Sequence, residues 1–430
     1  MNRRRFLQLA AGSAAAGLAP RLAVAQGAVR ALRAAPAEQL LVGAANPKTS
    51  LWAYGGSVPG PELRFRQGER LRIEVENALP VDTTVHFHGI RLPNAMDGVP
   101  HLTQSPIAKN GGRFVYEFDL PDAGTYWYHP HLGSPEQVDR RRLDREARIT
   151  TDFMSFMDAS HAGRIGNTVT VNGSIRESFA VRAGERIRLR LINASNARIY
   201  GLRFEGHEPS VIALDGHPVS PHKAERVVLG PAMRADLILD CASAPGSRHR
   251  VIDDFYQRRA YRLLDLQYLD EKPVKAAFPD VPALAPNPVA APNLASAERH
   301  RVVFGGGMMG AMPSQREHRG MFWTVNGTVL PEGHEHPAPM LTLARGKSYV
   351  MELVNDTSWH HPIHLHGHVF RVLTRNGRPV EGGEWGDTVL VDPDSRAEIA
   401  FVADNPGDWM FHCHVLEHQA SGMMAVVRVA

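Results

Sequence analysis

The sequence predicts an all-β protein built from three similar β-sandwich domains in series. Apolar and polar residues alternate over short stretches, Gly and Pro are frequent, and sustained helical periods are almost absent. One segment also recurs three times, at residues 67–77, 183–193 and 345–355. Each copy is a Gly-containing turn followed by a strand of period two that ends in Asn. Three copies of one unit imply three domains of one architecture.

The repeats give the expected domain boundaries. We expect a signal peptide over residues 1–25, a first domain over 26–145, a second over 146–270, a linker over 271–298 and a third domain over 299–430. The linker is rich in Pro and Ala and poor in periodicity. Part of it could equally be an ordered loop that lies across the second domain.

The N-terminal segment predicts export. Arg3-Arg4-Arg5 precedes an apolar stretch, and Ala23-Val24-Ala25 forms a cleavage site before Gln26. This pattern is similar to a twin-arginine signal, so we expect passage through the twin-arginine (Tat) translocase, a periplasmic protein and no stable membrane span. Lys and Arg number 48 and Asp and Glu 45, and four of the arginines lie in this segment. The near-neutral remainder argues against nucleic acid as the main partner.

Histidines gather in four groups near the first and third repeats. The groups are His86-Phe87-His88, His129-Pro130-His131, His361 with His364 and His366, and His412-Cys413-His414 with His418 and Met423 beyond. In a strand, residues i and i+2 point to the same face, so each His-x-His pair projects two imidazoles toward one point. Cys413 then faces away from its two neighbouring histidines, and one strand can contact two metal sites.

The residue types in the fourth group favour copper. A thiolate from Cys413, imidazoles from His418 and a second histidine, and a thioether from Met423 make up the ligand set of a blue-copper centre. The remaining imidazoles suit copper or zinc, but zinc cannot change its redox state. The other cysteine, Cys241, is expected to be a small buried hydrophobic residue.

These four groups resemble the copper motifs of the multicopper oxidases, the laccase-like family with three cupredoxin domains. The resemblance covers nearly the whole mature chain and includes residues 93–100 and 122–128. It implies three cupredoxin-like Greek-key β-sandwiches and a copper-dependent oxidoreductase with O2 as acceptor. Such an enzyme oxidises a phenol or a low-valent metal ion such as cuprous ion one electron at a time, reduces O2 to water, and holds about four coppers, one type 1, one type 2 and two type 3.

The resemblance also implies roles for individual residues. The type 1 ligands would be His361, Cys413, His418 and, axially, Met423; the type 2 ligands His86 and His364; one type 3 set His88, His129 and His414; and the other His131, His366 and His412. The three coppers of types 2 and 3 would form a trinuclear cluster between the first and third domains, reached by electrons from Cys413 through its flanking histidines. Asp97 matches an acid beside the type 2 copper, the alternative being a plain Asp-Gly turn. Gln419 stands where many bacterial relatives carry an acid.

The end of the first domain departs from the pattern of the third. The third domain finishes on an apolar strand at 422–429, whereas Leu132 is followed by polar and charged residues. We therefore expect a shortened junction between the first and second domains, with no closing strand between Leu132 and Asp152, which could leave the first domain with exposed edges.

Other functions need different residues. A copper nitrite reductase requires fewer histidines, and a copper-free or impaired cupredoxin scaffold or an electron-transfer protein would not need all four groups. The methionines of residues 305–312 could bind cuprous ion or could be part of a flexible loop. Trp359 and His360 are candidate substrate contacts beside His361. His161, His207, His217 and His222 have no informative spacing, and we expect them to be surface or structural residues.

Overall fold

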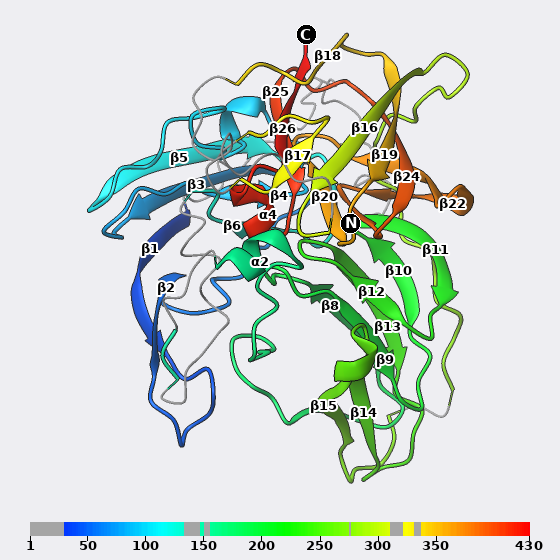
Figure 1. Cartoon of the computed structure of the whole chain (residues 1–430). Coiled ribbons are helices and arrows are strands. Elements are labelled where there is room, and N and C mark those ends of the chain that lie inside the picture. Colours follow the sequence, from blue (N-terminus) through cyan, green and yellow to red (C-terminus); the bar gives the residue numbers. More distant parts are fainter. Residues whose placement is uncertain (1–29, 133–146, 150–154, 275–276, 310–320, 331–336) are drawn as a thin grey trace, which may run out of the picture.

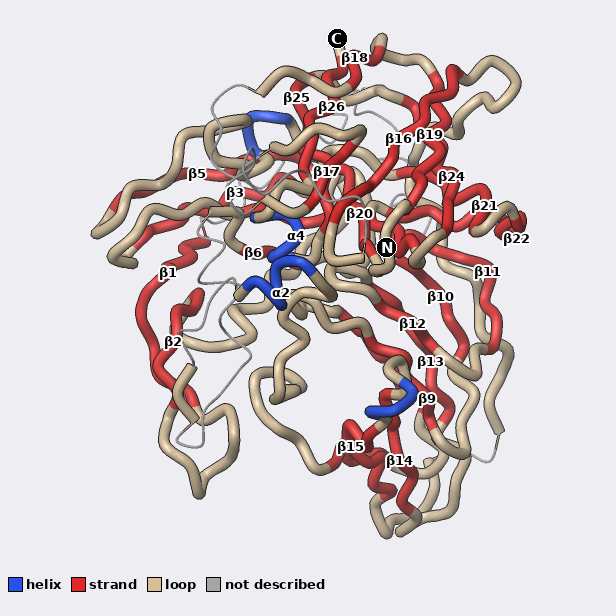
Figure 2. Tube along the Cα trace, viewed as in Figure 1, coloured by secondary structure: helices blue, strands red, loops and turns tan. Residues whose placement is uncertain are grey.

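The regular secondary structure of the described residues is almost entirely strand, with loops between the strands and only short helices (Figures 1 and 2), as the sequence predicts. The computed structural model describes residues 30–132, 147–149, 155–274, 277–309, 321–330 and 337–430. These residues form three cupredoxin domains, so the prediction of an all-β fold with three such domains is confirmed. No helix in the part of the chain that the structure describes is long and apolar enough to cross a membrane.

The first domain has one four-stranded and one two-stranded sheet. The larger sheet has the order β2-β1-β3-β5, and β4 pairs with β6 in the smaller one. The elements are β1 (Arg30–Gln39), β2 (Thr49–Tyr54), β3 (Arg70–Asn77), β4 (His86–His88), the 3-10 helix η1 (Asn94–Met96), β5 (Gly112–Asp119) and β6 (Trp127–His129).

The second domain has two sheets of similar size. Their orders are β11-β10-β13-β8 and β12-β9-β14-β15-β7. The elements are α2 (Phe156–Ser160), which precedes the sheets, β7 (Ser178–Val181), β8 (Arg186–Ile192), β9 (Tyr200–Phe204), β10 (Ser210–Leu214), β11 (His217–Lys223), β12 (Val227–Leu229), β13 (Arg234–Asp240), β14 (Arg248–Asp253), the 3-10 helix η2 (Gln257–Arg259) and β15 (Tyr261–Tyr268).

The third domain has a six-stranded and a five-stranded sheet, in the orders β17-β16-β19-β24-β21-β22 and β18-β26-β25-β20-β23. The elements are β16 (Glu298–Gly306), β17 (Trp323–Val325), β18 (Leu341–Leu343), β19 (Ser348–Asn355), β20 (His361–Leu365), β21 (Phe370–Arg375), β22 (Arg378–Gly386), β23 (Thr388–Val391), β24 (Ser395–Val402), β25 (Gly407–Cys413), α4 (Leu416–Ala420) and β26 (Met424–Val429).

The three sequence repeats form the equivalent strands β3, β8 and β19. β3 and β19 end in the buried asparagines Asn77 and Asn355, and the buried Asn193 directly follows β8. In each domain the amide of this asparagine donates to two backbone carbonyls at 2.7–2.9 Å, and its oxygen accepts from the N–H two residues later. The asparagine therefore closes the turn after the strand in all three domains.

The first and third domains share one hydrophobic core. A single cluster of buried side chains runs from Leu32 of the first domain to Val429 of the third, whereas the core of the second domain is a separate cluster. The helix α2 contacts α4 of the third domain, and the two lie side by side at the centre of the molecule in Figure 1. The interface between the first and third domains is thus an extension of their cores.

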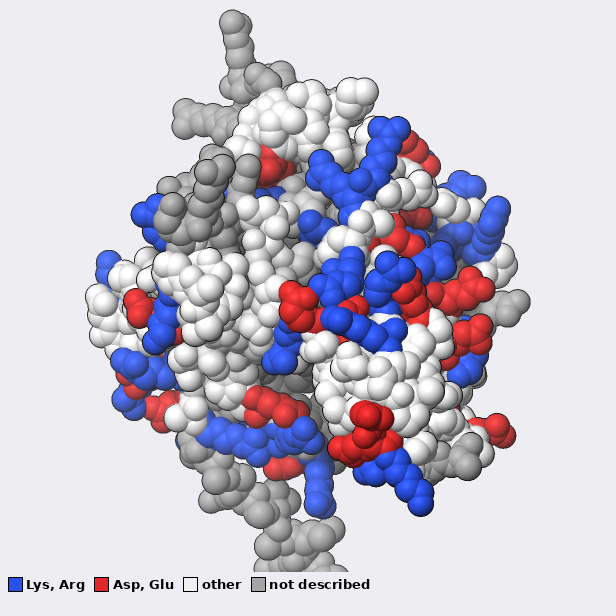
Figure 3. Space-filling view, turned by 90° about the horizontal axis from the view of Figure 1, so that it is seen from below, with Lys and Arg blue, Asp and Glu red and all other residues white. Residues whose placement is uncertain are grey.

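The segment expected to be a linker is ordered where the structure describes it. Asn287 joins the first two domains: its amide donates to Ala123 O (3.0 Å) and Gly216 O (3.2 Å), and its oxygen accepts from Ala123 N–H (2.9 Å). On the surface seen in Figure 3, basic and acidic side chains are intermixed.

The prediction of a shortened junction falls mostly on residues 133–146 and 150–154, which lie outside the described residues, as does the expected signal peptide. Of the residues between these segments, Ile149 packs against Leu41, Leu51 and Ala53 of the first domain. The hydroxyl of Thr49 also donates to Ala147 O at 2.7 Å. Residues 147–149 therefore pack on the first domain.

Candidate metal centre

Three potential ligand atoms converge inside the third domain. His361 Nδ1 and His418 Nδ1 lie 3.1 Å apart, and each is 3.5 Å from Cys413 Sγ. All three side chains are fully buried. They come from β20, the end of β25 and α4, so strand pairing between β20 and β25 brings His361 and Cys413 into one sheet.

The outer nitrogens of these two imidazoles are hydrogen-bonded. His418 Nε2 lies 2.6 Å from the carbonyl oxygen of His161, which can only accept, so Nε2 carries the proton. His361 Nε2 lies 2.8 Å from the Thr357 hydroxyl, whose own proton goes to Asn355 Oδ1. Both Nδ1 lone pairs are therefore free and directed at Cys413.

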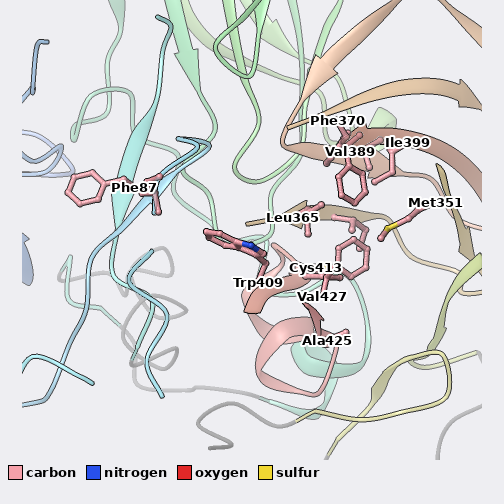
Figure 4. Packing of buried hydrophobic residues seen from close by; sticks show 14 of the residues in the cluster. Phe87, Met351, Leu365, Phe370, Val389, Ile399, Trp409, Cys413, Ala425 and Val427 are labelled. Atoms are coloured by element: carbon pink, nitrogen blue, oxygen red, sulfur yellow. The ribbon is translucent and has the colours of Figure 1, made fainter. Parts of the chain in front are cut away.

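The surroundings of this group are apolar. Cys413 lies among Leu365, Ala425 and Val427 (Figure 4), and Trp323 packs against both imidazoles with ring centroids 4.2 Å from His418 and 5.1 Å from His361. Burial raises the pKa of the Cys413 thiol and lowers the pKa of His418 to about 3. The imidazoles are thus neutral, as metal ligation requires, and a bound cation would be needed to hold Cys413 as a thiolate.

Met423 is also buried beside this group. Its carbonyl accepts from Cys413 N–H at 3.2 Å, and its own N–H donates to His418 O at 2.9 Å. These backbone hydrogen bonds hold Met423, the residue predicted as axial ligand, next to Cys413 and His418.

A second group of eight buried histidines lies between the first and third domains. Three overlapping sets have ligand atoms within 4.8 Å of one another. These sets are His86, His364 and His366; His131, His366 and His412; and His86, His88 and His129. The ring of His414 lies 5.1 Å from that of His88 and 5.2 Å from that of His129. All eight predicted histidines are therefore gathered in one place.

Two aspartates orient four of these histidines, each through its carboxylate and its backbone carbonyl. Asp97 Oδ2 accepts from His366 Nδ1 at 2.9 Å, and the Asp97 carbonyl accepts from His86 Nδ1 at 2.7 Å. Asp387 Oδ1 lies 3.0 Å from His88 Nε2, and its carbonyl accepts from His364 Nδ1 at 2.8 Å. Such partners fix which ring nitrogen carries the proton and so which one is free to bind a metal.

The free nitrogens identify this group as a metal site. His86 Nε2, His88 Nδ1, His129 Nε2 and His364 Nε2 are buried and have no hydrogen-bond partner. Burial also lowers the pKa of the imidazoles of His88, His129 and His364. Buried polar atoms without partners are costly, and a bound cation would satisfy all four. An all-imidazole set beside a thiolate suits copper.

Sequence reasoning missed Asp387 and the residue that it contacts in the second domain. Arg234 is fully buried and donates to both Asp387 oxygens, at 2.8 Å and 2.6 Å. Burial alone would raise the pKa of Asp387, but Arg234, His88 and His364 hold it well below its usual range. The only signal in the sequence was a Gly-Asp-Thr turn before the apolar strand β23, which is too common to be informative.

Sequence models described as multicopper oxidase match residues 39–140, 120–250 and 311–430. Two solved structures are similar over nearly the whole chain. A multi-copper oxidase from Pseudomonas thermotolerans is 34% identical, with 93% of this chain and 98% of that chain covered and a TM-score of 0.82. One from Pseudomonas parafulva is 36% identical, with 93% and 100% covered and a TM-score of 0.80. The chain belongs to the multicopper oxidases.

Multicopper oxidase MmcO from Mycobacterium tuberculosis is 29% identical, with 88% of this chain and 82% of the relative covered. The family and the gathered ligands confirm the predicted function, a copper oxidoreductase that reduces O2 with electrons from an oxidisable substrate. They also confirm a type 1 and a trinuclear copper centre. The ligand-poor alternatives considered from the sequence do not account for the two buried groups of this multicopper oxidase.

Proposed function

We propose that the copper ligands of this multicopper oxidase are those that the motifs imply. The hydrogen bonds of the outer nitrogens support this proposal, because they leave inward lone pairs on both predicted type 1 histidines and on both predicted type 2 histidines. The proposed sets are His361, Cys413, His418 and Met423 for type 1; His86 and His364 for type 2; and His88, His129, His131, His366, His412 and His414 for the type 3 pair.

Copper bound in these sets would supply one-electron redox chemistry and the binding of O2. The chain itself supplies the connection between the sets. His412 belongs to one trinuclear set and Cys413 to the type 1 set, and the two residues are adjacent in sequence. Asp97 orients two imidazoles of the trinuclear group and is the candidate, implied by the motifs, for an acid that supplies protons there.

We also propose that the physiological reductant is a small ion, cuprous ion, in preference to a phenol. The observation that supports this choice is that the backbone at His161 covers His418. The outer nitrogen of His418 donates to the His161 carbonyl, and the His418 ring is fully buried. A phenol would have to displace this carbonyl to reach His418. A metal ion needs only ligands on the outer side of the His161 backbone. From there, the hydrogen bond between His161 and His418 gives electrons a short route to the type 1 site.

The outside of this cover carries exposed sulfur ligands. Met157 of α2 is 59% exposed and Met309 is 83% exposed. The loop that carries Met309 is fastened to α2, because Met308 N–H donates to Ser160 O at 2.7 Å. Thioethers are soft ligands that favour cuprous ion, and exposed methionines gain nothing from packing. Trp359, predicted to contact substrate, lies under the same loop and donates to Met308 O at 3.1 Å.

The test compares oxygen uptake by the copper-loaded protein with cuprous ion and with a methoxyphenol. We expect faster uptake with cuprous ion and, in Met157→Leu/Met309→Leu, a KM for cuprous ion raised several-fold with unchanged methoxyphenol kinetics. Phe156→Leu, a change in the same helix without a sulfur, is the control. Faster methoxyphenol oxidation that the double variant leaves unaltered would make a phenol the reductant. A blue protein that consumes no oxygen with either would revive the impaired electron-transfer alternative.

We further propose that the chain is exported to the periplasm through the twin-arginine route. Arg3-Arg4-Arg5 and the cleavage pattern at Ala23-Val24-Ala25 support this proposal. The mature N-terminus, determined by mass spectrometry of the periplasmic fraction, should be Gln26. Replacing Arg3, Arg4 and Arg5 with Lys should retain the protein in the cytoplasm, and continued export would reject the route.

A further inference from the structure

A buried arginine of the second domain reaches Asp387, which contacts two of the trinuclear histidines. Among the described residues, every group that could hold a metal comes from the first and third domains. Arg234, at the start of β13, is fully buried, and its guanidinium forms a two-bond pair with Asp387 of the third domain at 2.8 Å and 2.6 Å. This geometry fixes the plane of the carboxylate as well as its position.

The same aspartate is the outer partner of two copper-site histidines from different domains, through its carboxylate for one and its backbone carbonyl for the other. Asp387 Oδ1 contacts His88 Nε2 of the first domain (3.0 Å), and Asp387 O accepts from His364 Nδ1 of the third domain (2.8 Å). The hydroxyl of Thr388 donates to Asp387 Oδ1 at 2.8 Å. Rotation of the Asp387 side chain would therefore leave His88 Nε2 with only the Thr388 hydroxyl at 3.2 Å, and movement of the Asp387 backbone would remove the closest partner of His364 Nδ1.

Arg234 is itself held by all three domains. Its Nη2 donates to Asp215 O at 2.9 Å and its Nε to Thr125 O of the first domain at 3.3 Å. Asp215 Oδ1 accepts from Arg234 N–H at 2.8 Å, while Asp215 Oδ2 accepts from Thr388 N–H at 3.2 Å. The guanidinium thus lies between the buried Asp387 carboxylate at 2.6 Å and the buried Asp215 side chain at 3.5 Å, in a setting that allows it little movement.

We propose that Arg234 is a positioning residue for the trinuclear copper site, through which the second domain holds Asp387 and, by way of Asp387, the imidazoles of His88 and His364. The second domain is then a determinant of copper binding although it supplies none of the ligand groups described above. This inference rests on the ligand roles of His88 and His364 proposed above.

The test is Arg234→Lys, which keeps the charge and removes the planar fork. We expect retention of type 2 and type 3 copper to fall about tenfold or more during dialysis against a chelator, because partners of metal ligands typically contribute that much. The readouts are copper per chain and the paramagnetic signal of type 2 copper. The blue absorption of the type 1 centre should remain, since no type 1 residue contacts Asp387 through the bonds described.

Arg186→Lys is the matched control. Arg186 also forms a two-bond pair inside the second domain, with Asp240 at 2.5 Å and 2.7 Å, but has no contact with a copper-site residue. Copper retention in Arg234→Lys equal to that of Arg186→Lys would overturn the proposal. Loss of the type 1 blue band together with the other coppers would also overturn it, because that pattern indicates general unfolding.

Asp387→Asn removes the same ion pair from the other side and serves if Arg234→Lys cannot be purified. It should show the same selective loss, and the double variant should lose no more than the worse single variant, because both changes act through one pair. Additive losses would overturn the proposal. Full copper retention in His88→Ala would instead reject the ligand assignment, which distinguishes the two failures.

Discussion

Replacing Gly89 with alanine tests the packing around the trinuclear site. Gly89 directly follows the first His-x-His pair and has φ +84°, a left-handed conformation that favours glycine. A Cβ at this position would lie 2.3 Å from Asp387 Oδ2 and 2.4 Å from Arg234 Nη2, whereas ordinary contacts begin near 3.4 Å. Neither atom can move freely, because each belongs to the buried ion pair.

The expected cost has two parts. Left-handed strain in an alanine is about 1 kcal/mol. Disrupting a buried ion pair costs about 3–5 kcal/mol, of which we expect most but not all here because the pair can shift before it breaks. Gly89→Ala should therefore lower the stability of the copper-free protein by about 3–5 kcal/mol.

Gly68→Ala isolates the strain. Gly68 lies in the same domain with φ +79°, but a Cβ there would meet nothing within 4 Å. This control should lose only about 1 kcal/mol. Urea unfolding of both variants, followed by tryptophan fluorescence, checks the difference. The variants are compared by their transition midpoints because a three-domain chain need not unfold in one step. Equal midpoints for the two variants would refute the steric reasoning.

Three further predictions concern other parts of the molecule. Asp97→Ala removes the acceptor of His366 Nδ1 and should weaken type 2 and type 3 copper retention about 10–100-fold, measured by the type 2 paramagnetic signal after dialysis; an unchanged signal would contradict the orienting role. Burial lowers the pKa of His217 from 6.5 to about 4, so the unfolded chain binds a proton between these pH values that the native chain does not. The wild type should therefore lose about 2–3 kcal/mol of stability between pH 7 and 4.5 relative to His217→Gln, and a constant difference in unfolding free energy would exclude this linkage. Asn287→Ala removes three hydrogen bonds that join the first and second domains and should lower the stability of the protein by about 1–3 kcal/mol, seen as a lower thermal midpoint. An unshifted midpoint would mean that the linker does not stabilise the contact between these domains.

The sequence indicated which residues gather in the two buried groups because their spacing is local. The spacing in His86-Phe87-His88 matches a strand, and β4 places both imidazoles in the second group of histidines. The alternation along His412-Cys413 likewise separates a histidine of the trinuclear group from a thiol of the type 1 group. The repeated asparagines close equivalent turns, so the repeats predicted the domain count.

The residues that orient the ligands could not be predicted in this way. Asp387 and Arg234 act through tertiary contacts with no fixed spacing, and the contacts of Asp387 with Arg234 and with His88 both join different domains. Thr357 lies only four residues before His361, but a Thr at this spacing is too common to stand out. His161 had been expected to be a surface or structural residue, but it contributes a backbone carbonyl to His418, and any residue type can supply a carbonyl. Such contacts follow from the packing of the domains and leave no pattern in the sequence.

The two copper centres differ in how much of the chain must assemble before each exists. His361, Cys413 and His418 all belong to the third domain, whereas the trinuclear histidines come from two domains whose cores merge. Loosening of the interface between the first and third domains would therefore separate the histidines of the trinuclear site, whereas the type 1 ligands would remain together within one domain.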